Sequence, residues 1–395
     1  MLDYLALLSA GVALGVLTGL VPGIHPNTVI FTSLPIYFNY DIGLTSYMSV
    51  VAGLSVSHTF HDFLPAIFLG APEAESALST LPGARMAMEG RGIEAFQLTV
   101  LGGVFSVAAA IFASPFLLLF LPEIYSFLEP HMAYLLAFFL SYIVFRSSRL
   151  RNSVVITVLA GALGTFSFSM QINQEFVLVP VFSGLFALPS IYHALRSDFR
   201  LPPQSSTQLS WERAERGGAV GMLAGLLAGV FPGLGAAVST SFLSPLLDSR
   251  EEFLAGMGGV NTSDILVSFV ALLLIGKSRS GASVALSSIS QVGMRETVFL
   301  SGTSLVAAAI AAPLALRVAP WFLHGLRRVD TGKLLLLVAL ALVLSTFFLT
   351  GPPGLLVLST SSFIGYAALL SGERASCMAV LMMPAISFYL PGTFI

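Results

Sequence analysis

The chain has 395 residues, of which 56% are hydrophobic and 10% are charged, and its formal net charge at pH 7 is −2. Its mean hydropathy of +0.89 excludes an ordinary soluble domain and indicates an integral membrane protein. A single cysteine, Cys377, excludes an intramolecular disulfide and a metal site built from cysteines. Helix-sized apolar runs at 100–121, 334–349 and 355–370 favour an all-α bundle of membrane-spanning helices.

The first predicted helix covers residues 4–21 and is broken by Pro22 and Gly23. Glycines at four-residue intervals give it a smooth stripe along one face: Gly11, Gly15 and Gly19. A break inside a membrane is tolerated only where the freed backbone lines a cavity or is buried in protein. We therefore expect this helix to pack closely against a neighbour and to unwind at the depth of the membrane.

The remainder of the first half alternates apolar segments with polar interruptions. Residues 27–37 are too short to span a membrane alone, and residues 44–69 carry a polar cluster inside an apolar stretch. Residues 70–83 are too polar for lipid and too apolar for a free loop, which is typical of a re-entrant hairpin tip. Further apolar segments follow at 95–121, 131–145, 153–170 and 176–195.

After a polar tract at 196–216, the pattern of the first half begins again. The glycine stripe and its Pro-Gly break recur with one constant offset (221 − 11 = 210), at Gly221, Gly225, Gly229, Pro232 and Gly233. Asp264 lies twelve residues before Gly276, as His58 lies twelve before Gly70. The sequence therefore predicts two transmembrane repeats, 1–195 and 217–395, joined by a linker at 196–216.

The distribution of Lys and Arg predicts the orientation of the repeats. In the first half these residues occur at 146–151 and are absent from 122–130. In the second half the loop equivalent to the uncharged one carries several, at 317–333, and the other, at 351–354, is neutral. Because positive loops stay in the cytoplasm, the repeats are predicted to be inverted, with a cytoplasmic linker and both termini outside.

In inverted-repeat transporters, substrate and ions bind near the midplane, where broken helices meet. Four polar side chains follow the two breaks and suit a carboxylate, a phosphate or a sodium ion: Asn27, Thr28, Ser239 and Thr240. The alternative interpretation is that Asn27 or Ser239 caps the helix after its break without holding any ligand.

Ionisable and amide side chains inside apolar sequence form a second candidate group: His58, His61, Asp62, Asn261 and Asp264. Such residues are costly at depth, so a role in coupling Na⁺ or H⁺ is one interpretation and a hydrogen-bonded helix interface is the other. A metal site is not expected, because His58, His61 and Asp62 lack a clear fourth ligand.

The two predicted tips carry opposite charges, Glu73 and Glu75 in the first half, and Lys277 and Arg279, followed by Ser280, in the second. If both tips approach the midplane, the basic residues and Ser280 would bind an anionic group and the acidic residues would carry protons. If the tips lie at the surface, all four charged residues are solvated loop charges.

The segments from Gly15 to Gly23 and from Gly225 to Gly233, both Gly-x-x-x-Gly-x-x-Pro-Gly, resemble those of the large membrane subunit of the tripartite tricarboxylate transporters. The stretch 70–91 resembles that family's small-residue tip and basic loop. The resemblance implies a secondary transporter of carboxylates, coupled to Na⁺ or H⁺. It also implies an extracytoplasmic binding protein and a small membrane subunit as partners.

The predicted function is therefore a multi-pass transporter of a small organic anion in the cell membrane. The charged tips depart from the mostly neutral tips of that family and keep open an alternative, a flippase for polyprenyl-phosphate lipid carriers. An intramembrane enzyme using His61 and Asp62 ranks last, because no nucleophile or metal accompanies them. No P-loop indicates an ATPase and no nucleic-acid partner is expected, while a homodimer stays open.

Overall fold

The computed structural model of the chain describes residues 2–22, 25–40, 42–70, 80–172, 176–196, 201–205, 209–278, 280–326 and 328–390. All regular secondary structure in these ranges is helical. The first half contains α1 (Leu2–Leu20), α2 (Pro26–Asn39), α3 (Leu44–His61), α4 (Phe63–Phe68), α5 (Thr80–Met88), α6 (Gly92–Leu128), η1 (Glu129–His131), α7 (Met132–Phe145), α8 (Leu150–Ser169), α9 (Leu178–Phe182), the π-helical turn η2 (Ser183–Ala187) and α10 (Leu188–Arg196).

The second half contains α11 (Trp211–Val230), α12 (Gly235–Leu243), η3 (Ser244–Leu246), α13 (Arg250–Ile275), α14 (Gly281–Ile289), α15 (Met294–Leu326), α16 (Thr331–Ser371), η4 (Arg374–Met378) and α17 (Ala379–Tyr389). Within the described ranges, 7 segments are long and apolar enough to cross a membrane, at 3–20, 92–145, 150–169, 178–196, 250–275, 294–326 and 332–371. The prediction of a helical, multi-pass membrane protein is confirmed at this level.

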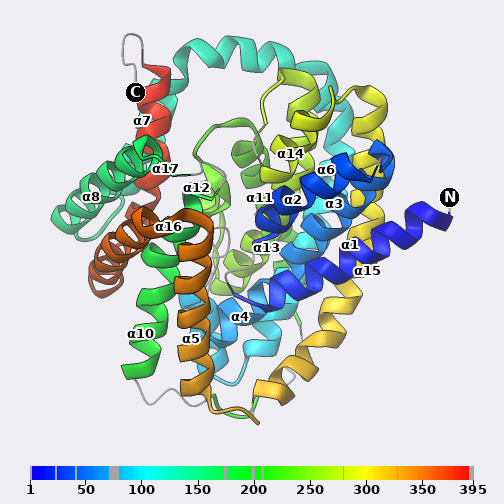
Figure 1. Cartoon of the computed structure of the whole chain (residues 1–395). Coiled ribbons are helices and arrows are strands. Elements are labelled where there is room, and N and C mark those ends of the chain that lie inside the picture. Colours follow the sequence, from blue (N-terminus) through cyan, green and yellow to red (C-terminus); the bar gives the residue numbers. More distant parts are fainter. Residues whose placement is uncertain are drawn as a thin grey trace.

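The two halves of the sequence interlock. In Figure 1, α7, α8, α16 and α17 lie on the left and α1, α3 and α15 on the right, with α11 and α13 between them. Helix α6 of the first half packs along α11 and α13 of the second, and α15 of the second packs along α3 of the first. One large core cluster accordingly contains residues of both halves, among them Phe60 and Leu254. The predicted repeat boundaries and the inverted orientation stay predictions.

The glycine stripe of α1 lies against α3 so closely that side chains would not fit. A Cβ added to Gly11 would lie 3.1 Å from the backbone nitrogen of Leu54. The corresponding distance is 2.9 Å from Gly15 to His58 and 3.0 Å from Gly19 to Asp62. The stripe therefore brings the two backbones together along the whole contact, as the spacing of the glycines predicts.

The same contact is formed a second time between α11 and α13. A Cβ on Gly221 would lie 3.0 Å from the nitrogen of Val260, one on Gly225 3.1 Å from Asp264, and one on Gly229 3.3 Å from Ser268. The partner residues of the two contacts differ by one constant offset (264 − 58 = 206). Equivalent residues of the two halves therefore occupy equivalent places, and His58 corresponds to Asp264.

The described part of the linker is bound to the protein. Gln204 accepts a hydrogen bond from the Gly92 nitrogen at 2.7 Å and donates one to the Ala87 oxygen at 2.9 Å. Helix α11 begins at Trp211, so its first turns include residues 211–216 of the predicted linker. Residues 197–200 and 206–208 of the linker lie outside the described ranges.

Candidate functional site

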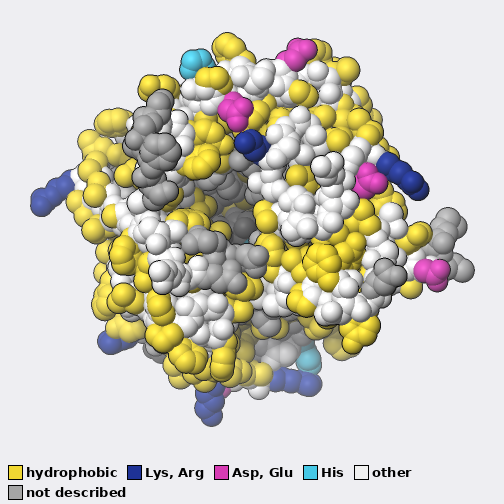
Figure 2. Space-filling view, turned by 45° about the horizontal axis from the view of Figure 1, so that its top comes forward, with side chains coloured by type: hydrophobic (Ala, Val, Ile, Leu, Met, Phe, Trp, Pro, Cys, Tyr) yellow, Lys and Arg dark blue, Asp and Glu magenta, His cyan; other side chains and the backbone are white. Residues whose placement is uncertain are grey.

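A cavity of about 470 Å³ lies where the helix breaks of both halves meet. The space-filling view in Figure 2 shows the molecule hollowed near the centre of one face, with uncharged side chains around most of the hollow. One wall of the cavity is apolar and includes Phe168, Phe182, Phe231 and Leu381. The polar part of the lining comes from α3, α13 and the starts of three other helices. The volume suits a small-molecule ligand.

The polar wall is assembled from equivalent positions of the two halves. Three residues of α3 line the cavity, and their counterparts on α13, each 206 positions later (264 − 58), line it too. The three pairs are Ser55 with Asn261, His58 with Asp264, and Thr59 with Ile265. The two halves thus contribute one site, whose chemistry differs between its two sides.

The first residues of three helices also line the cavity: Pro26 and Asn27 of α2, Gly235 and Ala236 of α12, and Gly281 and Ala282 of α14. The N-terminal end of a helix carries partial positive charge, so these ends together favour an anion. At α2, Pro26 has no N–H and the N–H groups of Asn27 and Thr28 donate to His25, so this start offers the Asn27 side chain rather than its backbone. Helices α2 and α12 begin shortly after Pro22 and Pro232, and Gly233 at the second break has a positive φ of 74°. Gly23 lies outside the described residues.

Of the four substrate residues predicted after the two helix breaks, Asn27 alone lines the cavity. Its carboxamide lies so close to Gly281 that an added Cβ there would overlap it. Thr28 is half-buried on α2 and does not line the cavity, while Ser239 and Thr240 are fully buried inside α12. The capping interpretation does not describe either residue, because His25 is the N-cap of α2 and Leu234 precedes α12.

Two of the predicted coupling residues face the cavity with ionisable side chains, His58 and Asp264. The Nδ1 atom of His58 lies 3.0 Å from the Thr18 hydroxyl, and its ring centroid lies 5.7 Å from that of His25. Asp264 accepts a long hydrogen bond of 3.4 Å from Ser268. Among the described residues, the titratable side chains of the lining are these two and His25.

His61 and Asp62 are buried and do not line the cavity. Asn261, which does, donates from Nδ2 to Asp62 at 3.1 Å and so ties α13 to the end of α3. The His61 Nδ1 atom lies 2.7 Å from the Ser57 oxygen. In the described part of the chain, no three His, Cys, Asp or Glu side chains are grouped as metal ligands.

The residues of the second predicted tip do not all lie at the cavity. Ser280 lines the cavity, as Ser278 does, and caps α14 by accepting from the Ser283 nitrogen at 3.2 Å. Lys277 does not line it, and its Nζ atom lies 3.7 Å from a carboxylate oxygen of Glu129. The other predicted charges of the tips lie outside the described residues: Glu73, Glu75 and Arg279.

Sequence reasoning missed His25, which both caps α2 and lines the cavity. The signal was available, because His25 lies between Pro22 and Pro26 in the break itself, whereas the search for ligands began after the break. Ser55 and Thr59 were part of the polar cluster in 44–69 but were not singled out. Their common spacing with His58 on α3 identifies the helix face that points into the cavity.

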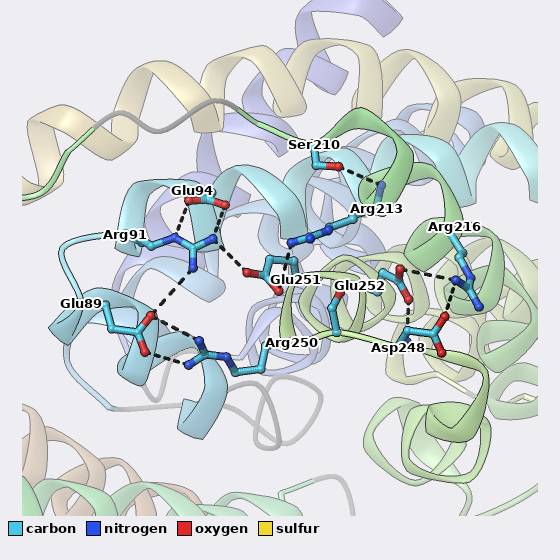
Figure 3. A network of polar contacts seen from close by, with 11 residues as sticks. Glu89, Arg91, Glu94, Ser210, Arg213, Arg216, Asp248, Arg250, Glu251 and Glu252 are labelled. Carbon is cyan, nitrogen blue, oxygen red and sulfur yellow. Dashed lines mark hydrogen bonds and ion pairs between the residues drawn. The ribbon is translucent and has the colours of Figure 1, made fainter.

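A network of charged side chains joins the two halves at the end of the molecule where residues 201–205 lie, here called the linker side (Figure 3). Arg91 contacts Glu94 at 2.7 Å and Glu251 at 2.9 Å, and Arg216 contacts Asp248 and Glu252. Arg250 donates to Glu89, and this hydrogen bond holds the pKa of Glu89 below its ordinary value. The network fixes the starts of α6, α11 and α13 relative to one another.

Comparison with known proteins identifies the class of protein to which this architecture belongs. An uncharacterized protein of Methanocaldococcus jannaschii is 28% identical, over 99% of this chain and 100% of its own length. An uncharacterized 52.8 kDa protein of Agrobacterium vitis is 27% identical over 67% of this chain and 59% of its own length. No solved structure matches the chain.

A sequence profile of the family described as tripartite tricarboxylate transporter TctA matches residues 5–380, nearly the whole chain. The resemblance carried by the two Gly-x-x-x-Gly-x-x-Pro-Gly segments is thereby confirmed. Members of this family are membrane subunits of transporters, which places the chain in the cell membrane as a multi-pass transport protein. The chain belongs to the TctA family of tripartite tricarboxylate transporters.

Proposed function

We propose that this chain carries a small organic anion of the carboxylate class across the membrane, bound in the cavity between the two repeats. The observation that supports the proposal most is the meeting of three helix starts, those of α2, α12 and α14, on one cavity. The backbone N–H groups at the starts of α12 and α14, together with the Asn27 carboxamide at the start of α2, offer a carboxylate several hydrogen-bond donors.

Coupling to Na⁺ or H⁺ follows from the single carboxylate in the described lining. Asp264 would repel a bound anion as long as it is charged, because two like charges in a cavity of low dielectric oppose each other strongly. A proton or a sodium ion on Asp264 removes that repulsion. Loading of the cation and of the anion therefore favour each other, which is the thermodynamic requirement for their joint transport.

The lipid-phosphate alternative loses one of its two supporting residues. It depends on Lys277 and Arg279 as phosphate ligands, yet Lys277 is paired with Glu129 and does not line the cavity. Arg279 lies outside the described residues. A flippase of polyprenyl phosphate stays an untested alternative, and competition between that lipid and a soluble carboxylate would decide between the two.

The family assignment also supports partners. TctA proteins act with an extracytoplasmic binding protein and a small membrane subunit, and we extend this expectation to the present chain. The binding protein would deliver the anion to the cavity from the extracytoplasmic side.

The proposal is tested by uptake of radiolabelled citrate and succinate into proteoliposomes containing the purified chain, with and without inward Na⁺ or pH gradients. Replacing Asn27→Ala removes one donor to the anion and should raise KM about 10- to 100-fold, the value of a hydrogen bond to a charged group. Ser239→Ala is the matched control, because Ser239 is equally polar, is buried and does not line the cavity. Equal KM values for the two variants would contradict the assignment of the cavity.

A further inference from the structure

The described chain buries one basic side chain for which the proposed function has no role. Arg374, at the start of η4, is 4% exposed. It makes one hydrogen bond, from Nη2 to the Phe186 oxygen at 3.2 Å. Its Nε and Nη1 atoms have no hydrogen-bond partner among the described residues, and no described acidic side chain forms an ion pair with it.

Burying an unpaired guanidinium costs free energy. A buried guanidinium without acceptors has lost its hydration and gained little in exchange, so an unpaired buried arginine implies a partner that binds at some stage of function. The neighbouring acid does not serve, because a Glu373 oxygen accepts a hydrogen bond from Ser147 instead. The free donors of Arg374 match a carboxylate in geometry and charge.

Arg374 lies two ring contacts away from the cavity. Its guanidinium carbon is 5.4 Å from the centroid of the Phe186 ring. The Phe186 ring is stacked on that of Phe182 at 5.9 Å, and Phe182 lines the cavity. Met378, at the other end of η4, lines it as well. Two aromatic side chains thus separate the cavity from the guanidinium.

On its far side, Arg374 adjoins the loop at 146–151, which the positive-inside pattern predicts to be cytoplasmic. Ser147 donates to Glu373, and Arg149 donates to the Ser371 oxygen at 3.2 Å, so this loop is attached to the residues just before Arg374. The residues just before Arg374 are therefore held against a loop that is predicted to be cytoplasmic, while Phe182 and Met378 connect its surroundings to the cavity.

We propose that Arg374 is a second binding station for the carboxylate of the transported anion, occupied after the anion leaves the cavity toward the linker side. This inference rests on the proposed function of the cavity. Displacement of Phe182 and Phe186 opens the path, and the guanidinium then binds the anion by donating hydrogen bonds from Nε and Nη1 before release. In the structure, the Phe186 ring contacts both the guanidinium and the Phe182 ring that lines the cavity.

The test compares Arg374→Met and Arg374→Lys in proteoliposomes, with citrate and succinate as probes. Arg374→Met should lower the maximal uptake rate about 10- to 100-fold, because a charge-assisted hydrogen bond on the path is lost, and leave KM at the outer cavity within about twofold. Arg374→Lys keeps the charge and should recover part of the rate. The matched control is Arg146→Met, since Arg146 also lies over an aromatic ring, that of Tyr142, but is exposed.

A second measurement separates binding from a structural role. Phenylglyoxal modifies accessible arginines. The buried Arg374 of the wild-type protein should therefore react slowly at rest and faster during citrate transport, when the path opens, whereas the exposed Arg146 should react equally in both conditions, as measured by mass spectrometry. A structural arginine would instead give lower unfolding temperatures and equally low uptake rates in both Arg374 variants, and transport would not change the modification rate of Arg374. That result, or unchanged uptake by Arg374→Met, overturns this inference and leaves the proposed function intact. If the wild type takes up no carboxylate at all, both the proposed function and this inference are overturned.

Discussion

At the scale of single residues, the chemistry of the site arises from the difference between His58 and Asp264. Both positions lie against a glycine of the preceding stripe, Gly15 and Gly225, and both side chains enter the cavity. One is a base and the other an acid. A site built from two equivalent halves therefore has one side that accommodates an anion and one that requires a cation.

The variant Asp264→Asn tests the acidic side. A carboxamide of the same shape imitates the neutralised carboxylate, so the anion should still bind, while uptake should no longer accelerate under an inward Na⁺ or pH gradient. The measurement is the ratio of initial uptake rates with and without the gradient, and for Asp264→Asn it should fall to about 1. If the ratio stays at the wild-type value, Asp264 is not the coupling carboxylate, and Asp62 becomes the candidate for that role.

The variant Gly281→Ala tests the contact at the start of α14. An added methyl group would overlap the Asn27 carboxamide and displace it, so KM should rise as it does for Asn27→Ala. Because the two changes act on one contact, the double variant should be no worse than Asn27→Ala alone. Additive effects in the double-mutant cycle would show that Gly281 acts independently of Asn27.

At the scale of the helices, close approach of backbones holds the bundle together. Gly102 of α6 lies against the Ala255 backbone of α13, and Gly258 of α13 lies against the Thr99 backbone of α6, in both cases without room for a methyl group. In lipid, where burial of apolar surface gives little driving force between helices, such contacts supply dispersion energy over a long interface. The glycines therefore determine which helices become neighbours.

Gly102→Ala should destabilise the protein by about 1–3 kcal/mol through overpacking at this interface. Gly302→Ala on α15 is the control, because nothing lies within 4 Å of an added Cβ there. It should be neutral or stabilising by up to about 1 kcal/mol, the helix preference of alanine over glycine. Thermal unfolding in detergent would measure both variants, and equal unfolding temperatures would contradict the packing argument.

At the scale of the whole molecule, the charged network on the linker side holds the two halves together. Arg91 is shared by Glu94 and Glu251, whose side chains are only 6% and 10% exposed. Removing it would leave two largely buried carboxylates short of their common donor. Arg250 and Glu89 form a pair in which both side chains are more than 40% exposed, and water can replace that contact.

Arg91→Gln should therefore lower the free energy of unfolding by about 2 kcal/mol, whereas Arg250→Gln should change it by less than about 1 kcal/mol. Unfolding temperatures of the two variants, measured at the same salt concentration, would show the difference. Similar small shifts would mean that Arg213, which lies 3.5 Å from Glu251, replaces Arg91 in the network.

The sequence alone predicted what depends on local spacing. Glycines four residues apart must share a helix face, and Pro22 and Pro232 must interrupt their helices, so the helix breaks and the repeated α1–α3 and α11–α13 contacts could be foreseen. The side chains that enter the cavity could not. Helix α12 begins at Gly235, and since each residue turns a helix by about 100°, that start directs Ser239 and Thr240 into the protein interior. Arg374 was missed because its burial depends on contacts far away in the sequence.

The interlocking of the halves also governs how the protein is made. The contact between Gly102 of α6 and Ala255 of α13 cannot form until Ala255 has been synthesised, 153 residues later (255 − 102). At a synthesis rate of about 5–20 residues per second, this delay lasts roughly 8–30 s, and during that time α6 lacks its contact with α13. A chain truncated within the linker would leave α6 in that state permanently. Quality control in the membrane can therefore recognise an unfinished transporter by the uncovered face of α6.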